Sequence, residues 1–403
     1  MPPSRPVTVI ARSTGIAASL GKCTPPVWIS RCPCTGAIQA TTRAGNRSGV
    51  HADLATDAGK EWLYVTVRDF FVHVPAEFWA TVEGRPIVWL YTAAFAKRQD
   101  EAALDYLRAE FARDFGVEPF VVKEASWQGR ADASYAWGAA LKPNLYDVAA
   151  VGPGYDHSAV PGRTPLVRQR EEGAFYRRSW EWMLSRDPAK RPAIAVVETW
   201  NEWHEGTDIA PSKEYGRKYV DLTRHYAELW HARKRVSRQG KFAGATSVSA
   251  TLGDPPTFAG LSLHAWEDGK TEPTRVAGKA ARTTAPTKFT GRYFYFDVDD
   301  AFFFQDDETV EIEVEYLDRA KGTLVLEYDS TDVNAPHRGA FKSREVAVLR
   351  GTNAWRTARV RLEDAAFSGR GNGGDFRFSV SPGDLVLTKC LVRKASKARA
   401  ATR

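Results

Sequence analysis

Residues 193–208 read AIAVVETWNEWHEGTD, and this stretch decides the interpretation of the fold. Its first five residues form an uninterrupted apolar run, typical of a buried strand in a parallel sheet. The run leads directly into a segment with three glutamates, one aspartate, two tryptophans, a histidine and an asparagine. In parallel barrels the reacting side chains stand at the carboxyl ends of the strands. The stretch therefore predicts a buried strand with a polar site at its end.

Apolar runs and amphipathic helical patterns alternate along the chain around this stretch. Strands are expected at residues 62–67 (WLYVTV), 86–95 (PIVWLYTAAF), 119–123 (PFVVK) and 147–151 (DVAAV), and helices at residues 101–115, 171–185 and 214–233. This alternation predicts parallel βαβ units. A complete (β/α) barrel needs about 250 residues. Residues 56–235 are therefore expected to form the C-terminal part of an α/β parallel (β/α) barrel that is incomplete at its N-terminal side.

The first 55 residues differ in composition from the rest of the chain. No acidic residue precedes Asp53, and the segment is rich in Pro, Ser, Thr, Arg and Gly without apolar periodicity. It has neither the apolar core of a secretory signal nor the amphipathic pattern of a transit peptide. Residues 1–55 are therefore expected to be a disordered, non-native leader.

Charge, hydropathy and cysteine usage exclude several classes of protein. The formal net charge of +7 comes largely from the two ends of the chain, including the basic tail at residues 396–403. Between the ends, acidic and basic residues are interleaved, so nucleic-acid binding is not expected. No segment reaches the roughly 18 apolar residues of a membrane span. A zinc site is not expected either, because His204 has no second histidine four residues away and the cysteines show no paired spacing.

The C-terminal part of the chain has the texture of an all-β module. Residues 236–250 are rich in Ser, Gly and basic side chains and are expected to be a linker. Residues 251–395 contain short alternating segments separated by turn residues, which predicts a β-sandwich of the jelly-roll kind. Its acidic loops could hold a structural Ca²⁺ or could be ordinary solvated turns, and their residues are Asp297, Asp299, Asp300, Asp306 and Asp307.

Glu202 and Glu205 are the candidate catalytic carboxylates. Cleavage of a glycosidic bond needs one carboxylic acid to protonate the leaving oxygen and a second carboxylate on the other side of the developing cation. On one turn of a helix-like loop, residues three apart have Cβ atoms about 5–6 Å from each other, which suits a retaining arrangement. Neighbouring side chains expected to stack on a sugar or bond to its hydroxyls are Trp200, Asn201, Trp203 and His204. The alternative is that these acids only cap a helix or pair with basic residues.

Other strand ends supply further candidates for substrate binding. They are Tyr91 in the run at 86–95, Glu124 and Trp127 after the run at 119–123, and Tyr155, Asp156 and His157 after the run at 147–151. For the last three, ordinary hydrogen bonding within the loop is an equally good interpretation.

The run Glu202-Trp203-His204-Glu205-Gly206-Thr207 resembles the signature of the endo-α-mannosidase and endo-α-mannanase family of glycoside hydrolases and its bacterial relatives. The resemblance implies that Glu202 assists the sugar 2-hydroxyl in its attack on the anomeric carbon and that Glu205 is the general acid and base. It also implies a polysaccharide or glycan substrate, no redox cofactor, a secreted or periplasmic location and an N-terminally truncated barrel. Such a truncated chain is expected to be a poor catalyst or none.

A rival hypothesis is a non-catalytic carbohydrate-binding protein that acts through its C-terminal jelly roll. Binding of polysaccharides without release of reducing sugar would favour the rival. The sequence leaves open the sugar, the linkage, endo or exo action and the oligomeric state.

Overall fold

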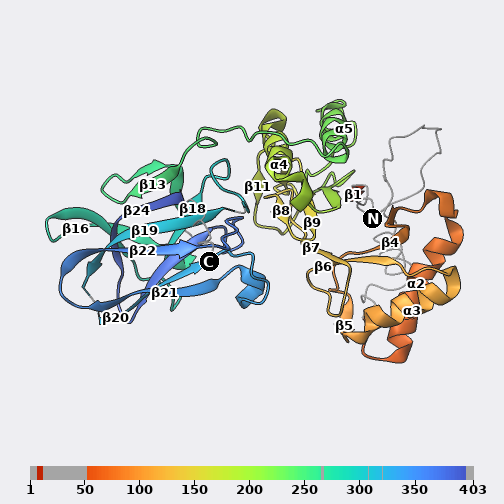
Figure 1. The fold of residues 1–403 in the computed structure, drawn as a ribbon, viewed down its shortest axis with the longest axis horizontal. Coiled ribbons are helices and arrows are strands. Elements are labelled where there is room, and N and C mark those ends of the chain that lie inside the picture. Colours follow the sequence, from red (N-terminus) through yellow and green to blue (C-terminus); the bar gives the residue numbers. More distant parts are fainter. Residues whose placement is uncertain (1–6, 12–51, 265–266, 307, 320, 396–403) are drawn as a thin grey trace, which may run out of the picture. The chain divides into compact units, whose positions relative to one another are not determined.

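The computed structural model describes residues 7–11, 52–264, 267–306, 308–319 and 321–395 (Figure 1). The chain divides into two compact units, Met1–Ser237 and Arg238–Arg403. Within the described residues, no helix combines the length and the apolar character that crossing a membrane requires.

The first unit contains two sheets built mainly from parallel strands. One has the order β3 (Thr81–Val82), β4 (Arg85–Leu90), β6 (Phe120–Glu124) and β7 (Ala133–Tyr135). The other has the order β1 (Val7–Ala11), β12 (Ile194–Glu198), β9 (Val148–Val151) and β8 (Asn144–Leu145). Only the short edge strands β3 and β8 run antiparallel to their neighbours. The described residues of this unit also form two short strand pairs: β2 (Ala52–Asp53) with β5 (Ala96–Arg98), and β10 (Tyr155–Asp156) with β11 (Val167–Arg168).

Side chains of the parallel strands alternate between two apolar clusters. Ile87 and Trp89 of β4 face a cluster that also includes Val148 and Ile194 of the other sheet. Val88 and Leu90 face the helices α2 (Asp57–His73) and α3 (Ala102–Phe115). Because both sheets contribute to one interior while helices cover the outer face, the arrangement is barrel-like, as the sequence predicted. The described residues of this unit also form the helices α4 (Ala174–Ser185) and α5 (Lys218–His231).

The predicted strand at residues 62–67 is wrong, because these residues belong to α2. The helix begins after Thr56, whose Oγ1 accepts a hydrogen bond from the backbone N of Gly59 at 3.1 Å. Leu63, Val67 and Phe71 then repeat every four residues and are buried against β4 and β6. A short apolar run fits a buried strand and a buried helix equally well, so its period could not decide between them.

The expectation that residues 1–55 have no regular structure is wrong for Val7–Ala11. This segment forms β1, which pairs in parallel with β12 from Val7 opposite Ile194 to Ala11 opposite Glu198. An unpaired edge of β12 would expose a row of backbone donors and acceptors, and the apolar, β-branched run of β1 covers it. Ala52–Asp53 also pairs, as β2. The predictions for the intervening residues 12–51 lie outside the described residues.

The second unit is a sandwich of two antiparallel sheets, in agreement with the sequence. The larger sheet has the order β14 (Thr257–Ala259), β13 (Ser247–Thr251), β24 (Val386–Ala395), β17 (Lys279–Thr284) and β16 (Thr271–Val276), and β19 (Thr309–Asp318) pairs with both β24 and β22 (Ala354–Leu362). The smaller has the order β15 (Leu261–His264), β18 (Phe294–Val298), β23 (Phe376–Ser381), β20 (Lys321–Tyr328) and β21 (Lys342–Arg350). Alternate residues of both sheets, such as Ile312 and Leu326, form one core.

The predicted linker at residues 236–250 is too long. Arg238 donates to Asp306 at 2.9 Å, Phe242 packs against the sandwich core, and β13 begins at Ser247. Polar composition concealed this because β13 shows only two buried side chains, Val248 and Ala250, between exposed ones.

Candidate functional site

The loop that follows β12 carries both candidate glutamates and is closed at its base. Thr199 Oγ1 lies 2.9 Å from Thr207 Oγ1, and the backbone N of Thr199 donates to the carbonyl of Thr207 at 2.8 Å. Thr199 Oγ1 also accepts from the backbone N of Glu202 at 3.1 Å. These bonds fix the two ends of the loop together, so residues 200–206 project from the carboxyl end of a buried strand.

Glu202 and Glu205 each keep part of their side chain accessible, 23% and 24% respectively. Glu205 Oε1 accepts a hydrogen bond from Arg163 Nη1 at 2.8 Å, and its carbonyl accepts from the backbone N of Asp156 at 2.8 Å. Glu202 Oε1 lies 3.6 Å from His204 Nδ1. The structure thus places both carboxylates where a ligand can reach them.

Tyr91, which follows β4, interacts electrostatically with glutamates at the ends of β6 and β12. Burial, and then the charges of Glu198, Glu205, Glu124 and Glu202, raise the pKa of the Tyr91 hydroxyl to about 12. Because such effects weaken with distance, carboxylates at the ends of β6 and β12 share one region with the tyrosine that follows β4. Tyr91, Glu124, Glu202 and Glu205 are therefore near enough for their charges to interact. The ring of Tyr91 packs edge-on against Trp137, with centroids 4.8 Å apart.

Glu198, the last residue of β12, is a buried carboxyl to which sequence reasoning assigned no role. Its Oε2 accepts from the backbone N of Gly138 at 3.0 Å, while Oε1 has no hydrogen-bond partner among the described residues. Burial raises the pKa of Glu198 to about 8, against the opposing effect of backbone N–H groups at residues 138–140. The negative charge of Glu205 adds to the rise. From the sequence, Glu198 could be recognised as an acid directly after an apolar strand, but the sequence did not show that its side chain is buried.

Tyr155 and His157 form a pair in the loop beside Glu205. Burial and the charge of Glu205 raise the pKa of the Tyr155 hydroxyl, which lies 2.8 Å from His157 Nδ1. The other ring nitrogen of His157 lies 2.8 Å from the carbonyl of Thr164. His157 is buried with both nitrogens occupied, so its expected contact with a sugar is replaced by a role in positioning Tyr155. Asp156 is exposed and accepts from Ser158.

Trp127 was predicted to bind substrate, and the structure corrects this. Only 4% of the residue is exposed, and its ring packs 5.5 Å from that of Phe95 in the cluster under the helices. Its Nε1 donates to the backbone carbonyl of Tyr91. Trp127 therefore holds the end of β4 in place, and an apolar indole of this kind could not be distinguished from a sugar platform by sequence.

The remaining candidates of the loop differ in exposure. Trp203 is 51% exposed and His204 is largely exposed, so both are open to a ligand. Trp200 and Asn201 are half-buried, and Asn201 Oδ1 has no hydrogen-bond partner among the described residues.

Asp208, the last acid of the run, has a structural partner. Its Oδ1 accepts from Arg170 Nη2 at 2.9 Å, and both side chains are nearly buried. The guanidinium of Arg170 packs on the rings of both Tyr215 and Tyr219, 4.4 Å and 4.5 Å from their centroids, and these two rings meet edge to face at 5.2 Å. For this acid, the interpretation as a partner of a basic residue is confirmed.

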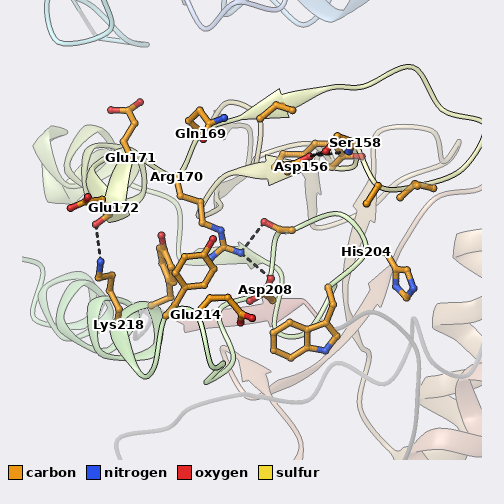
Figure 2. Close-up of a pocket in the computed structure, with 18 residues that line it drawn as sticks. Asp156, Ser158, Gln169, Arg170, Glu171, Glu172, His204, Asp208, Glu214 and Lys218 are labelled. Carbon is orange, nitrogen blue, oxygen red and sulfur yellow. Dashed lines mark hydrogen bonds and ion pairs between the residues drawn. The ribbon is translucent and has the colours of Figure 1, made fainter.

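A cavity of about 1010 Å³ opens beside the loop (Figure 2). Its walls come from the β10–β11 hairpin, residues 169–172, the loop after β12 and residues 214–219. Trp203 and His204 line it, whereas neither Glu202 nor Glu205 does. Four of the sequence-predicted candidates, Tyr155, Asp156, Trp203 and His204, line this cavity, whereas the β10–β11 hairpin that forms part of its wall was not recognised.

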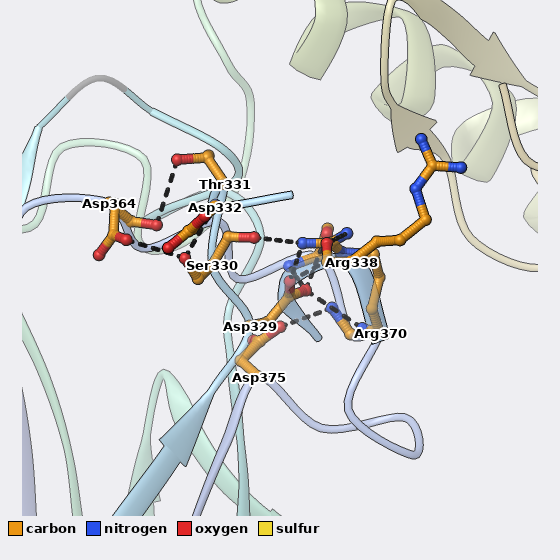
Figure 3. Close-up of polar contacts among 10 residues, drawn as sticks. Asp329, Ser330, Thr331, Asp332, Arg338, Asp364, Arg370 and Asp375 are labelled. Carbon is orange, nitrogen blue, oxygen red and sulfur yellow. Dashed lines mark hydrogen bonds and ion pairs between the residues drawn. The ribbon is translucent and has the colours of Figure 1, made fainter. Parts of the chain in front are cut away.

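Two acids of the loops that could hold Ca²⁺ or be solvated turns accept hydrogen bonds from the protein. Asp306 pairs with Arg238, and Asp299 accepts from the backbone N of Ala301, while Asp307 lies outside the described residues. Among the described residues, no group of three or more Asp, Glu, His or Cys side chains could hold a metal ion. Figure 3 shows how other acids of the unit are satisfied: Arg370 lies against the fully buried Asp329.

Fold and site together define an α/β protein with an acid-rich site at the carboxyl ends of parallel strands, followed by a β-sandwich. Residues 32–239 match the family described as "Domain of unknown function (DUF5010)", and the chain belongs to that family.

Part of the chain is also similar to proteins named for mannoside cleavage. A glycoprotein endo-alpha-1,2-mannosidase-like protein from Danio rerio is 39% identical over 96 residues, which are 22% of this chain and 21% of the relative. The chain thus spans about a fifth of the length of the curated relatives it matches. The GH99 endo-alpha-mannosidase structure from Bacteroides thetaiotaomicron has a TM-score of 0.32 and 18% identity, covering 44% of this chain and 63% of that one. The CBM22-1 xylan-binding domain of Paenibacillus barcinonensis Xyn10C has a TM-score of 0.26 and 16% identity, covering 37% of this chain and 94% of that domain.

Proposed function

We propose that this protein is a glycoside hydrolase that cleaves a polysaccharide or glycan by a two-carboxylate retaining mechanism. The observation that carries the proposal is the placement of Glu202 and Glu205. Both project, partly exposed, from a loop fixed at the carboxyl end of the buried strand β12. The names of the relatives, which refer to endo-α-mannosidases, support the same class.

In the first half of the proposed reaction, Glu205 gives its proton to the leaving glycosidic oxygen. The sugar 2-hydroxyl oxygen bonds to the anomeric carbon as Glu202 accepts its proton, and the bond to the leaving oxygen breaks. In the second half, Glu205 takes a proton from water, whose oxygen opens the strained ring at the anomeric carbon, and Glu202 returns the proton to O2. Two inversions at that carbon give net retention.

Other residues support this chemistry from the surrounding loops. Arg163 lies against Glu205 and stabilises the carboxylate that acts as the base in the second half. The charge of Glu205 raises the pKa of both the Tyr91 and the Tyr155 hydroxyl, and we assign these two hydroxyls to binding sugar hydroxyls near Glu205. We also assign Glu124, Trp200 and Asn201 to the substrate-binding site around the two glutamates.

The test is release of reducing sugar from α-mannan, xylan and β-glucan by the full chain, with the anomer of the first product followed by NMR. A product that first forms with the anomeric configuration of the substrate supports the retaining mechanism, and an inverted product contradicts it. Absence of release from every polysaccharide contradicts the proposed activity.

The alternative function is carbohydrate binding by the sandwich, which we propose to be a jelly roll. One observation favours it: Arg377 of β23 lies 3.8 Å from the ring centroid of Tyr293 and 4.4 Å from that of Phe341, and both rings are half-exposed. Calorimetric titration with the same polysaccharides separates the two functions. Binding that Tyr293→Ala abolishes, without release of reducing sugar, favours the alternative.

A further inference from the structure

We propose that the cavity beside the loop after β12 is a subsite for an uncharged segment of the glycan chain, next to the bond that is cleaved. This inference rests on the proposed function and names the class of substrate. The cavity, at about 1010 Å³, lies at the upper end of the range of ligand pockets.

The floor of this subsite is rigid. Arg170 packs on two adjacent tyrosine rings, and its Nη2 donates to Asp208 Oδ1 at 2.9 Å and to the carbonyl of Gly206 at 2.8 Å (Figure 2). These contacts hold the guanidinium in one orientation, so the surface is formed before a ligand arrives. They also neutralise its charge, because the ion pair with Asp208 is nearly buried. Arg170 is therefore a structural element of the floor and not a receptor for an anion.

Two aromatic side chains line the cavity with accessible surface. Trp203 is 51% exposed and Tyr215 is 38% exposed. A pyranose has apolar C–H faces and polar edges, so it fits a site that combines aromatic surface with a few placed polar groups. Arg170 covers one face of the Tyr215 ring, which fixes the orientation of the ring that meets the ligand.

The charge of the walls selects against anions. Five acids line the cavity, whereas its basic residues are Arg170 and Lys218. Of the acids, Asp208 pairs with Arg170 and Glu171 pairs with Arg178 at 2.8 Å, which leaves Asp156, Glu172 and Glu214. Lys218 Nζ lies 3.4 Å from the backbone carbonyl of Glu172 and balances one of these charges. The remaining negative field repels carboxylated or phosphorylated chains and offers acceptors to neutral hydroxyls.

Trp203 ties the subsite to the cleavage point. It lies between Glu202 and Glu205 in the sequence, so the cavity that it lines adjoins the loop that carries the two carboxylates. Binding of these extra units would help to position the scissile bond, which contributes to the rate on long substrates.

The test uses the full chain with Glu205→Gln, so that binding is measured without turnover. Calorimetry is performed with mannotetraose, xylotetraose, cellotetraose and maltotetraose as neutral probes and tetragalacturonate as the anionic probe. We expect at least one neutral probe to bind and tetragalacturonate to bind at least tenfold more weakly. Adding Trp203→Ala or Tyr215→Ala should weaken the neutral probe at least tenfold, and Tyr215→Phe should retain its affinity. Phe258→Ala, which removes an exposed ring of the second unit, is the matched control and should change nothing.

Several outcomes overturn the subsite. These are the absence of binding by all neutral probes, unchanged affinity in both the Trp203→Ala and the Tyr215→Ala variants, and preference for tetragalacturonate. The double variant Glu172→Gln/Glu214→Gln should reduce the discrimination against tetragalacturonate, and unaltered discrimination contradicts the electrostatic argument.

The subsite and the proposed function fail in different ways. If the native chain cleaves a polysaccharide but Tyr215→Ala and Trp203→Ala leave KM for long chains unchanged, the subsite is wrong and the hydrolase stands. If nothing is cleaved but the neutral probe is lost in Tyr215→Ala, the hydrolase is wrong and the subsite stands.

Discussion

The acids at the strand ends of the first unit and the acids inside the sandwich are the same residue types in opposite surroundings. Asp329 is fully buried and accepts from Arg370 Nε at 2.8 Å and from both the backbone N and Oγ of Ser368 at 2.9 Å. Glu198 is also buried, but its Oε2 accepts from the backbone N of Gly138 and not from a basic side chain, and its Oε1 has no hydrogen-bond partner among the described residues. A paired buried acid supports a fold, whereas an unpaired one costs stability.

The same contrast extends to exposure. Asp364 in the sandwich accepts from Tyr328, Ser330 and Lys342, which fills its oxygens with protein donors. Glu202 and Glu205 are partly exposed and leave room for donors that are not part of the protein. Incompletely paired acids are typical of functional sites. The comparison therefore supports the proposed role of these two acids in the first unit, whereas the acid network of the second unit stabilises its fold.

The largest effect that would test this comparison is on the rate. Glu205→Gln should lower kcat by about 10² to 10⁴ because the amide cannot transfer a proton, while the fold remains intact. The measurement is reducing-sugar release on the best polysaccharide substrate, with circular dichroism as the check on folding. Glu118→Gln makes the same chemical change at an exposed position before β6, at the opposite end of the strands, and should leave kcat unchanged. Undiminished hydrolysis by Glu205→Gln would remove this residue from the mechanism.

The next effect concerns the sandwich. Arg370→Met should lower the free energy of unfolding by about 3–5 kcal/mol, because Asp329 would stay buried without its partner. Denaturant titration of the full chain measures this. Lys270→Met removes an exposed pair with Glu272, at 3.7 Å, and should cost at most about 1 kcal/mol. An equal loss of unfolding free energy in the two variants would contradict the idea that the buried pair stabilises the sandwich more than an exposed pair does.

A third effect separates the two kinds of acid by pH. Burial raises the pKa of Glu198 from its ordinary value of 4.5 to about 8, so the folded state binds more protons than the unfolded state between these pH values. Its contribution therefore makes stability fall as pH rises from 4.5 towards 8, by up to a few kcal/mol. Glu198→Gln should abolish this fall, so the variant gains on the native chain in thermal melts as pH increases. A constant difference between the two melting curves across that range would show that Glu198 titrates normally.

The smallest effect concerns Trp127. Trp127→Phe removes the indole N–H that donates to the carbonyl of Tyr91 and should cost about 0.5–1.5 kcal/mol of stability. KM should stay within twofold of the native value if Trp127 is a structural residue. A KM that rises tenfold with unchanged stability would restore Trp127 to the substrate site.

Patterns that span many residues could be predicted from the sequence, and those that depend on a partner far along the chain could not. The helix predicted at 101–115 is confirmed as α3. It ends at Gly116, whose φ of 72° suits a glycine. The strand at 62–67 was wrong because its apolar run has no decisive period. β1 was missed because its partner β12 lies at the other end of the unit.

The same division holds at the site. Glu202 and Glu205 could be named as candidates from the sequence because strand-end acids beside aromatic residues form a local pattern. The burial of Trp127 and His157 depends on which side of a strand end faces the helices or the neighbouring loop, and no local pattern encodes that. The raised pKa of Glu198 is a consequence of its burial, which the backbone N–H groups at residues 138–140 only partly offset, and the sequence alone does not reveal that burial.

The pairing of β1 with β12 has a consequence for the order of folding. Val7 leaves the ribosome before any other described residue, yet its partner Ile194 is made only when almost the whole unit has been synthesised. Closing so long a loop carries an entropic cost that must be met before the contact stabilises anything, and contacts of this kind slow folding. Until β1 docks, the free edge of the strand that carries the candidate site is open to another chain, so aggregation of the nascent unit should compete with this step.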